Sequence, residues 1–298
     1  MLDPRKLRIV ARFELLEALR SRLFLVVLAL YGAGAATGSF VFLKVLAAAE
    51  NAARRALATS GSIPESHIPD DLVRAHALPF VGHLIEDDAL RSELLSIPPL
   101  AIFYGYMALL LVPLLVLATS AGAIASDLSS GAARFALFRC DRATWATGKL
   151  LGQETLLAAG LLAGALLAGT VGMLMTSEFD LEIWAWLVRT SFRAWLYGSG
   201  WLGIFLGFSF VVRKPMAARA LALFTLIGFA VLHGLLTAEF INAHLPGVRF
   251  LAVLLPTHHR DALWSPHLGT YLVSVGAVLA IGTAAFTAGL SLFRRRDA

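Results

Sequence analysis

Six long apolar stretches, each without a single Asp, Glu, Lys or Arg, run through this sequence of 298 residues. A helix needs about 20 mostly apolar residues to cross a hydrocarbon core of roughly 30 Å. The stretches are residues 23–43, 100–126, 155–176, 194–212, 220–237 and 271–293. Only 15% of the residues are charged, whereas soluble domains carry about a quarter. The sequence therefore predicts an all-α integral membrane protein with six transmembrane helices.

Lys and Arg are distributed unequally between the segments that separate these spans. An even number of spans places both termini on the same side of the membrane. If the termini are cytoplasmic, the inner segments hold 16 of the 25 Lys and Arg residues, and the outer segments share the other nine. Because basic loops tend to stay in the cytoplasm, we expect cytoplasmic N- and C-termini. The net charge of +5 follows from this topology and does not indicate nucleic-acid binding.

Residues 1–22 predict an interfacial elbow helix that leads into the first span. Ile9, Phe13 and Leu16 share one side of a helical wheel, in a segment that also holds six Lys and Arg residues. Basic amphipathic helices of this kind lie in the membrane surface. The same segment also acts as a positive anchor for topology, and the two roles are compatible.

The two longer outer segments are predicted to be helical but irregular. Residues 44–99 begin with "KVLAAAENAARRALA", which extends the first span, and continue as a small extracytoplasmic helical cap without a large core of its own. Residues 238–270 are apolar but interrupted by Pro246, Gly247, Pro256 and Pro266, which predicts broken re-entrant helices between spans five and six. The whole chain, 1–298, is predicted to be one transmembrane domain.

The sequence lacks the motifs of the common catalytic and cofactor-binding sites. "ATGKL" contains Gly148 and Lys149 but not the spacing of a nucleotide-binding loop, and no HExxH zinc motif is present. The lone Cys140 excludes a disulfide within the chain and disfavours a cysteine metal site. Seven of the eight histidines lie in the outer segments, where solvated side chains are a simpler interpretation than a metal site or a pH sensor. We therefore expect no catalytic residue, metal or cofactor in this chain.

Two polar residues within or beside the spans admit a functional or a structural interpretation. "YGSGW" places Ser199 in the fourth span, and His233 lies in the fifth. The pair weakly resembles the rhomboid-protease pattern, but Tyr197 replaces the glycine of that pattern and the histidine lies on the neighbouring span rather than two spans later. Ser199, Gly203 and Gly207 recur every four residues, and this spacing favours close helix packing.

Glu154, at the start of the third span, is the second case. A carboxylate inside the membrane is costly and therefore often functional. We expect either an interfacial ion pair with Lys149 or a hydrated carboxylate, rather than a proton relay.

Residues 126–149, "SDLSSGAARFALFRCDRATWATGK", form the longest cytoplasmic segment between spans. Apolar "FALF" lies between Arg134 and Arg139, as in helices that bind a hydrophobic groove and use the flanking charges to set their register. Because the chain has no nucleotide-binding loop, the natural partner of this coupling segment is a separate ATPase.

The order of motifs in this segment resembles the permease subunits of type-2 ABC exporters. The matching features are Asp127, Gly131, "FALF", Asp141-Arg142 and Gly148-Lys149. Asp127 stands where that family usually has Glu, Arg139 where it has Pro, and Asp141 where it has Ser. The basic elbow "ARFELLEALRSRLF", the broken outer helices and the closing "LFRRRDA" extend the resemblance to nearly the whole chain.

The resemblance implies a half-transporter of the bacterial inner membrane. This chain would carry no catalytic residues, and a separate chain would hydrolyse ATP. Two permease chains, identical or homologous, pair above a dimer of cytoplasmic ABC ATPases that bind ATP and Mg. The residues expected to dock the ATPase are Asp127, Gly131, Arg134, Phe135, Phe138, Arg139 and Arg142. A substrate would be exported between the two permeases, along a path lined by spans one, two and five.

Phe103, Tyr104 and Tyr106 of span two are candidates for this path, although they serve equally well as packing aromatics. The cap at residues 44–99 is a possible site for an extracytoplasmic protein. Two alternatives stay open from the sequence: a non-enzymatic membrane assembly factor or sensor, and an intramembrane serine protease.

Overall fold

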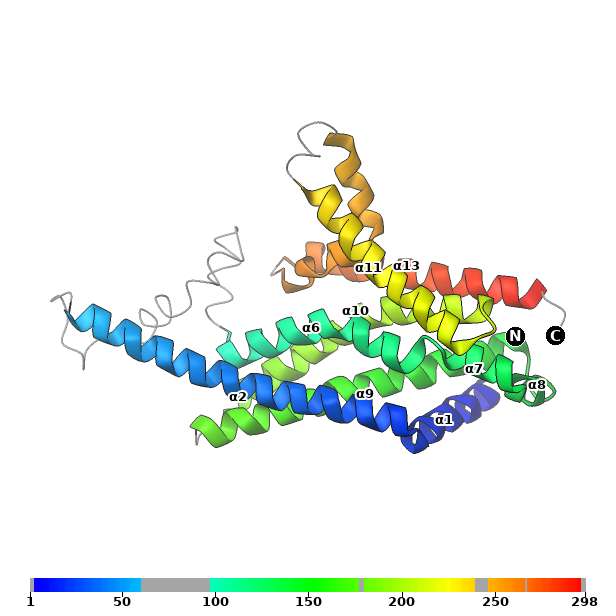
Figure 1. Cartoon of the computed structure of the whole chain (residues 1–298), viewed down its shortest axis with the longest axis horizontal. Coiled ribbons are helices and arrows are strands. Elements are labelled where there is room, and N and C mark those ends of the chain that lie inside the picture. Colours follow the sequence, from blue (N-terminus) through cyan, green and yellow to red (C-terminus); the bar gives the residue numbers. More distant parts are fainter. Residues whose placement is uncertain (1–2, 60–96, 177–179, 239–245, 266, 296–298) are drawn as a thin grey trace. The chain divides into compact units, whose positions relative to one another are not determined.

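The computed structural model describes residues 3–59, 97–176, 180–238, 246–265 and 267–295, and within these residues the chain is helical without any strand. The elements, drawn in Figure 1, are α1 (Pro4–Arg20), α2 (Arg22–Thr59), α6 (Pro99–Ser120), α7 (Ala123–Ser130), α8 (Ala132–Leu137), α9 (Arg142–Thr176), α10 (Leu181–Val211), α11 (Pro215–Thr237), three 3₁₀ helices η2 (Pro246–Leu254), η3 (Pro256–His259) and η4 (Asp261–Trp264), and α13 (Leu268–Arg295).

Six of these helical stretches are long and apolar enough to cross a membrane. They are α2, α6 continued by α7, α9, α10, α11 and α13. Each contains one of the predicted apolar runs, except that α10 ends one residue before the run 194–212 does. The prediction of an all-helical chain with six helices long and apolar enough to cross a membrane is therefore confirmed for the described residues. The single-domain organisation and its subdivisions stay a prediction.

The chain divides into two compact units, of which one comprises Gly32–Met107 and Leu162–Thr190. In this unit α2 packs closely on its neighbours: an added Cβ at Gly32 would meet Leu167 of α9 at 2.7 Å, and the Phe42 ring stacks on Phe103 of α6 at 4.6 Å. As predicted, the first span continues as a helix to Thr59. The proposed helical cap that follows lies largely in residues 60–96, outside the described residues.

The other unit comprises Met1–Tyr31, Ala108–Leu161 and Ser191–Ala298, and α10 lies at its core. Trp201, Phe205 and Phe210 of α10 are fully buried. The backbone of α10 touches that of α13, because an added Cβ at Gly203 would collide with the carbonyl of Gly282. The predicted small-residue face is thus confirmed at Gly203 and also at Gly207, which meets Ala285 of α13.

The segment before α13 is broken into short helices, as its prolines and glycine predict. η2, η3 and η4 follow one another without forming an α-helix. Ala252 and Leu255 of this segment form a small buried cluster with Leu236, at the end of α11. The apolar run in η2 is therefore held against α11, and it is too short to cross a membrane.

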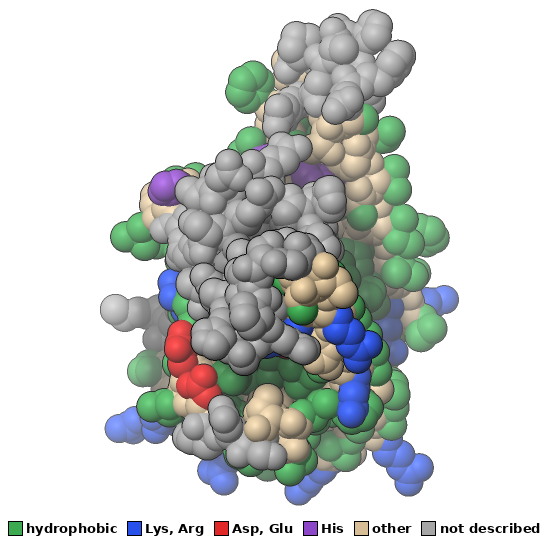
Figure 2. Space-filling model, turned by 90° about the vertical axis from the view of Figure 1, so that its left-hand side faces the viewer, with side chains coloured by type: hydrophobic (Ala, Val, Ile, Leu, Met, Phe, Trp, Pro, Cys, Tyr) green, Lys and Arg blue, Asp and Glu red, His purple; other side chains and the backbone are tan. Residues whose placement is uncertain are grey.

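Large hydrophobic side chains cover much of the described surface. Helices α2 and α11 are only 11% buried over their most apolar windows, and they expose Leu, Val, Ile and Phe side chains along their length. Figure 2 shows many hydrophobic side chains, drawn in green, among the described residues on the face turned to the viewer. A surface of this kind suits lipid or another apolar helix rather than water.

Candidate functional site

The coupling segment is a helical hairpin that begins where the second span breaks. After α6 ends at Ser120, a two-residue turn leads to α7, and Gly131 separates α7 from α8. Gly131 has φ of 78°, a left-handed conformation that glycine adopts without strain, and it ends α7 as a C-cap residue does. Buried Ser209 of α10 accepts a hydrogen bond from the backbone N–H of Ala125 at 2.9 Å, which fixes α7 to the core.

Helix α8 exposes two aromatic side chains. Phe135 is 75% exposed and Phe138, just after the helix, is 86% exposed, while Ala133 on the other face is buried. Arg134 and Arg139, on either side, are exposed as well. The structure thus brings four of the seven predicted docking residues together on one accessible surface, which we call the α8 surface (Arg134, Phe135, Phe138 and Arg139).

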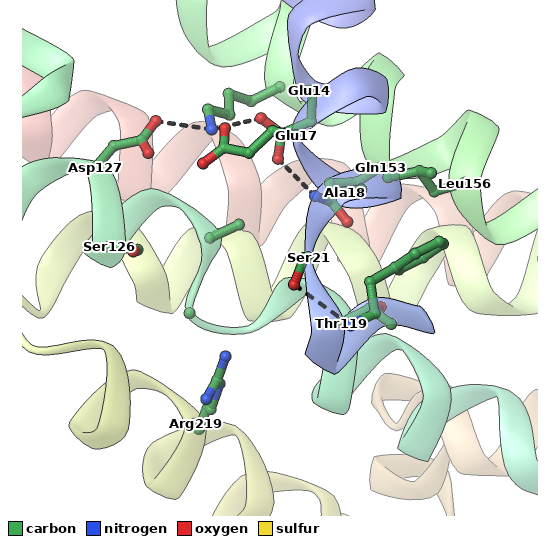
Figure 3. A pocket seen from close by; sticks show the side chains of 14 residues that line it. Glu14, Glu17, Ala18, Ser21, Thr119, Ser126, Asp127, Gln153, Leu156 and Arg219 are labelled. Carbon is green, nitrogen blue, oxygen red and sulfur yellow. Dashed lines mark hydrogen bonds and ion pairs between the residues drawn. The ribbon is translucent and has the colours of Figure 1, made fainter. Parts of the chain in front are cut away.

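Asp127 does not belong to the α8 surface, because its carboxylate is engaged inside the chain. Lys149 of α9 lies 2.7 Å from Asp127 Oδ2 and also forms an ion pair with Glu14 of α1. The Lys149 side chain is only 4% exposed. Two carboxylates from different helices therefore share one buried ammonium group, as the dashed lines in Figure 3 show.

Hydrogen bonds extend this arrangement to the end of the second span. Gln153 Nε2 donates to Glu14 Oε1 at 2.6 Å, and Ser120 Oγ donates to Gln153 Oε1 at 2.7 Å. We call Glu14, Ser120, Asp127, Lys149 and Gln153 the Lys149 cluster. It joins α1, α6, α7 and α9, so the base of the coupling segment is tied to three other helices.

Two glycines of α9 make this close approach possible. An added Cβ at Gly152 would meet the Glu14 side chain at 2.7 Å, and one at Gly148 would meet Val10 at the same distance. Helix α1 therefore lies directly on α9, and any larger side chain at these positions would push Glu14 away from Lys149. Gly148, the first residue of the Gly148-Lys149 pair, therefore serves the packing of α1 on α9.

A cavity of about 140 Å³ lies beside the Lys149 cluster. Its walls include Glu17 of α1, Ser21 between α1 and α2, Ser126 of α7 and Arg219 of α11. Figure 3 shows Arg219 on the opposite side of the cavity from Glu14 and Glu17. The Arg219 Nε atom is close to Gly122, in the turn between α6 and α7, where an added Cβ would meet it at 3.2 Å.

The Arg142 side chain also forms its contacts within the chain. Its guanidinium donates to the backbone carbonyls of Phe293 at 3.0 Å and Arg294 at 2.9 Å, and lies 5.2 Å from the centre of the Phe293 ring. These are the last carbonyls of α13, which a cation near a helix C-terminus satisfies. Arg142 therefore joins the start of α9 to the end of α13 and does not belong to the α8 surface.

Asp141 caps the N-terminus of α9. Its carboxylate accepts hydrogen bonds from the backbone N–H of Thr144 at 2.9 Å and from the Thr144 hydroxyl at 2.6 Å. These hydrogen bonds lower the pKa of Asp141 below its usual value. Asp and Ser are both good N-caps, so replacing the family's usual Ser with Asp preserves the cap.

We expect Asp141→Ala to lower the free energy of unfolding by about 1 kcal/mol, the usual cost of a lost N-cap. Because the pKa of Asp141 is lowered in the folded state, the contribution should be present above the unfolded pKa and disappear as the pH falls through the folded one. Thermal unfolding of detergent-solubilised protein at neutral and acidic pH measures this, with Asp141→Ser as the matched control that keeps a cap. Equal stability of the Ala and Ser variants at neutral pH would contradict the assignment.

Glu154 differs from the sequence prediction. Lys149 pairs with Glu14 and Asp127, and Glu154 Oε2 instead accepts a hydrogen bond from Ser199 of α10 at 2.7 Å. Residues five apart lie about 140° apart around a helix, so Lys149 and Glu154 point in different directions. Of the two expected alternatives, the ion pair between Lys149 and Glu154 is therefore not formed.

The same hydrogen bond bears on the protease alternative. Ser199 Oγ donates hydrogen bonds to Glu154 and to the carbonyl of Trp195. The His233 ring packs instead on the His258 ring, with the two ring centres 5.8 Å apart. These contacts give Ser199 no histidine base. Ser199 is therefore a polar link between α9 and α10, and the small-residue face of α10 uses Gly200 in its place.

The three candidates for the translocation path have different surroundings. Phe103 stacks on Phe42, Tyr104 is buried at 2% exposure, and Tyr106 is 40% exposed. Of these three side chains, that of Tyr106 is the most exposed.

Sequence reasoning missed Glu14, Gln153 and Ser120. Glu14 alone carried a usable signal, because it lies on the same side of a helical wheel as Val10, Ala11 and Ala18, away from Ile9 and Phe13. A carboxylate on an otherwise apolar, small-residue face indicates a buried partner. Nothing in the sequence, however, identified Lys149 as that partner.

Comparison with known families decides what kind of protein carries this hairpin. A model described as "ABC-2 family transporter protein" matches residues 8–298, nearly the whole chain. The chain belongs to the ABC-2 transporter family. No curated protein matches it. As an ABC-2 permease component it is a multi-pass membrane protein without ATPase activity of its own, and ATP is in general bound by a partner ATPase.

Proposed function

We propose that this ABC-2 permease exports a substrate across the bacterial inner membrane, driven by a separate ATPase dimer that docks on the α8 surface. The observation that carries the proposal is the exposure of Phe135 and Phe138, at 75% and 86%, on a short helix between two spans. Aromatic side chains this exposed indicate a binding partner. Because the sequence has no nucleotide-binding loop, the ATP that drives transport must be bound by that partner.

The chemistry of the α8 surface fits a helix that inserts into a groove. Phe135 and Phe138 would fill the groove, since aromatic side chains supply much of the affinity at protein interfaces. Arg134 and Arg139 would contact an acidic rim and fix the register. Asp127, Gly131 and Arg142 would act behind this surface, by holding α7, α8 and α9 in place.

The Lys149 cluster supports a route from the docking surface to the spans. α8 follows α7 directly, and α7 is held through Asp127 and Lys149 to α1 and α9. A displacement of α8 would therefore act on several helices at once. For ATP to drive such a change, the complex must bind ATP more tightly in one conformation than in the other.

The positions of the basic residues support a cytoplasmic location for both termini. Arg142 at the start of α9 contacts the end of α13, so the end of the last span lies beside the coupling segment. Helix α1 packs on the same part of α9. We infer that these elements face the cytoplasm together, with α1 as an interfacial elbow and η2–η4 as a re-entrant segment on the outer side.

Two permease chains would form the transport path between them. The largely exposed helices α2 and α11, together with α6, would line it, and Tyr106 is the most accessible of the candidate residues. The partner chain would be a second copy or a homologue, and the predicted cap at residues 44–99 would contact any extracytoplasmic partner.

The proposal predicts that Phe135→Asp with Phe138→Asp abolishes ATPase binding. Each aromatic anchor lost should weaken binding by about 30-fold, the effect of an interface hot spot of about 2 kcal/mol. Co-purification of the ATPase with tagged permease from membranes measures this. Phe250→Asp is the matched control, because Phe250 is equally exposed, at 77%, but lies in η2. Full ATPase recovery with the double variant would show that α8 is not the docking helix.

A further inference from the structure

Helix α1 carries a second exposed apolar surface, distinct from that of α8. Ile9 and Phe13 are 68% and 64% exposed, and Leu16 and Leu19 are also exposed. Ile9, Phe13 and Leu16 are spaced four and three residues apart, so they form one stripe along the helix. A stripe of this size on an exposed helix indicates a binding partner.

The stripe cannot be hidden by rotating the helix, because the opposite face is already used. Val10 and Glu14 pack against Gly148 and Gly152 of α9, and Glu14 is held there by Lys149 and Gln153. The buried ion pair therefore fixes the orientation of α1. Whatever covers Ile9 and Phe13 must come from outside this part of the chain.

The level of α1 along α9 indicates the surroundings of the stripe. α1 contacts α9 at Gly148 and Gly152, and the charge-free run of α9 starts three residues later, at Thr155. Three residues of helix correspond to about 4.5 Å. α1 also leads through Ser21 directly into α2, another span. It therefore lies at the level where lipid headgroups meet the hydrocarbon.

The charge around the stripe is strongly positive. The exposed basic residues of this helix are Arg5, Lys6, Arg8, Arg12 and Arg20, and Arg22 follows at the start of α2. Of the acidic residues, Glu14 is buried and paired, Asp3 caps the helix, and Glu17 is exposed. Long basic side chains beside an apolar stripe can reach anionic headgroups while the stripe enters the acyl region.

We propose that the outer face of α1 is a binding surface for anionic phospholipids of the cytoplasmic leaflet. This inference rests on the proposed topology, with α1 on the cytoplasmic side. Charge complementarity selects acidic lipids over neutral ones, since each Lys or Arg near an anionic surface strengthens binding by about fivefold. Because α1 also holds Asp127 through Lys149, lipid binding would steady the base of the coupling segment.

The test uses the full chain with Cys140→Ser, which removes the sole native cysteine. A nitroxide is attached at Phe13→Cys on the stripe, or at Phe135→Cys on α8 as the control. The protein is reconstituted in nanodiscs of phosphatidylcholine alone or with phosphatidylglycerol, and accessibility to oxygen and to a nickel chelate reports the depth of the label. We expect the label at position 13 to lie in the lipid and to move deeper with phosphatidylglycerol, and the label at position 135 to stay in water.

The charge requirement is tested by adding Arg8→Gln and Arg12→Gln. The two substitutions should reduce the number of phosphatidylglycerol molecules retained in native mass spectrometry and lower the apparent affinity by about 25-fold. A label at position 13 that stays in water, that ignores lipid charge, or that is shielded only after the ATPase is added would overturn the inference. Loss of ATPase binding to α8 with normal lipid dependence would instead contradict the proposed function alone.

Discussion

Replacing Lys149 with Met should lower the free energy of unfolding by about 3–5 kcal/mol, the cost of removing one partner from a buried ion pair. The substitution preserves most of the side-chain volume but leaves Glu14 and Asp127 facing each other without a counter-charge. Both carboxylates are poorly exposed, and Glu14 in particular is 6% exposed. The folded chain must then either keep a buried charge without a partner or open the contact between α1, α7 and α9.

Thermal unfolding in detergent, followed by the loss of the monodisperse size-exclusion peak, measures this cost. Lys6→Met is the matched control, because Lys6 forms an exposed pair with Asp3 and exposed pairs contribute about 0–1 kcal/mol. Adding Glu14→Gln and Asp127→Asn to Lys149→Met removes the stranded charges and should restore most of the stability. If Lys149→Met melts with the unaltered protein, the cluster does not hold these helices together.

Gly203→Leu should be about as damaging, through packing rather than charge. Any Cβ at position 203 would overlap the backbone of Gly282, and backbone atoms cannot move aside as a flexible side chain does. α10 and α13 would have to separate, which we expect to cost at least about 3 kcal/mol, at the upper end of the range for overpacked cores. Because α10 is the core helix of its unit, folded protein should fall sharply in yield.

Gly228→Leu provides the control for this variant. Gly228 lies in α11 with no atom within 4 Å of an added Cβ, so the same change there meets open space. The yield and the melting temperature of the solubilised protein should be near those of the unaltered chain for Gly228→Leu and far lower for Gly203→Leu. Similar behaviour of the two variants would mean that α10 and α13 are not in backbone contact.

The spans and the coupling hairpin were predictable because their signals are local. A charge-free run of about 20 residues has few alternatives in a membrane protein, so the six helices followed from composition alone. Phe135 and Phe138 were identified because they interrupt a polar, basic segment. The glycine periodicity of span four similarly indicated close packing before its partner helix was known.

The interactions inside the site could not be predicted because they join distant parts of the chain. Lys149 meets Glu14 from α1, Arg142 meets the last carbonyls of α13, and Glu154 meets Ser199. Each of these contacts depends on which helices are neighbours, and the order of the apolar runs does not determine this. From the sequence, Asp127 and Arg142 were therefore predicted to lie on the surface that docks the ATPase. In the structure, both side chains form their contacts within the chain.

We expect α8 to face the cytoplasm, and labelling of Phe138→Cys in the Cys140→Ser background measures this. A membrane-impermeant maleimide is applied to spheroplasts and to inverted membrane vesicles. We expect labelling in inverted vesicles alone, together with protection from the reagent when the ATPase is bound. Labelling in intact spheroplasts would place this helix outside the cell, where no cytoplasmic ATPase can dock on it.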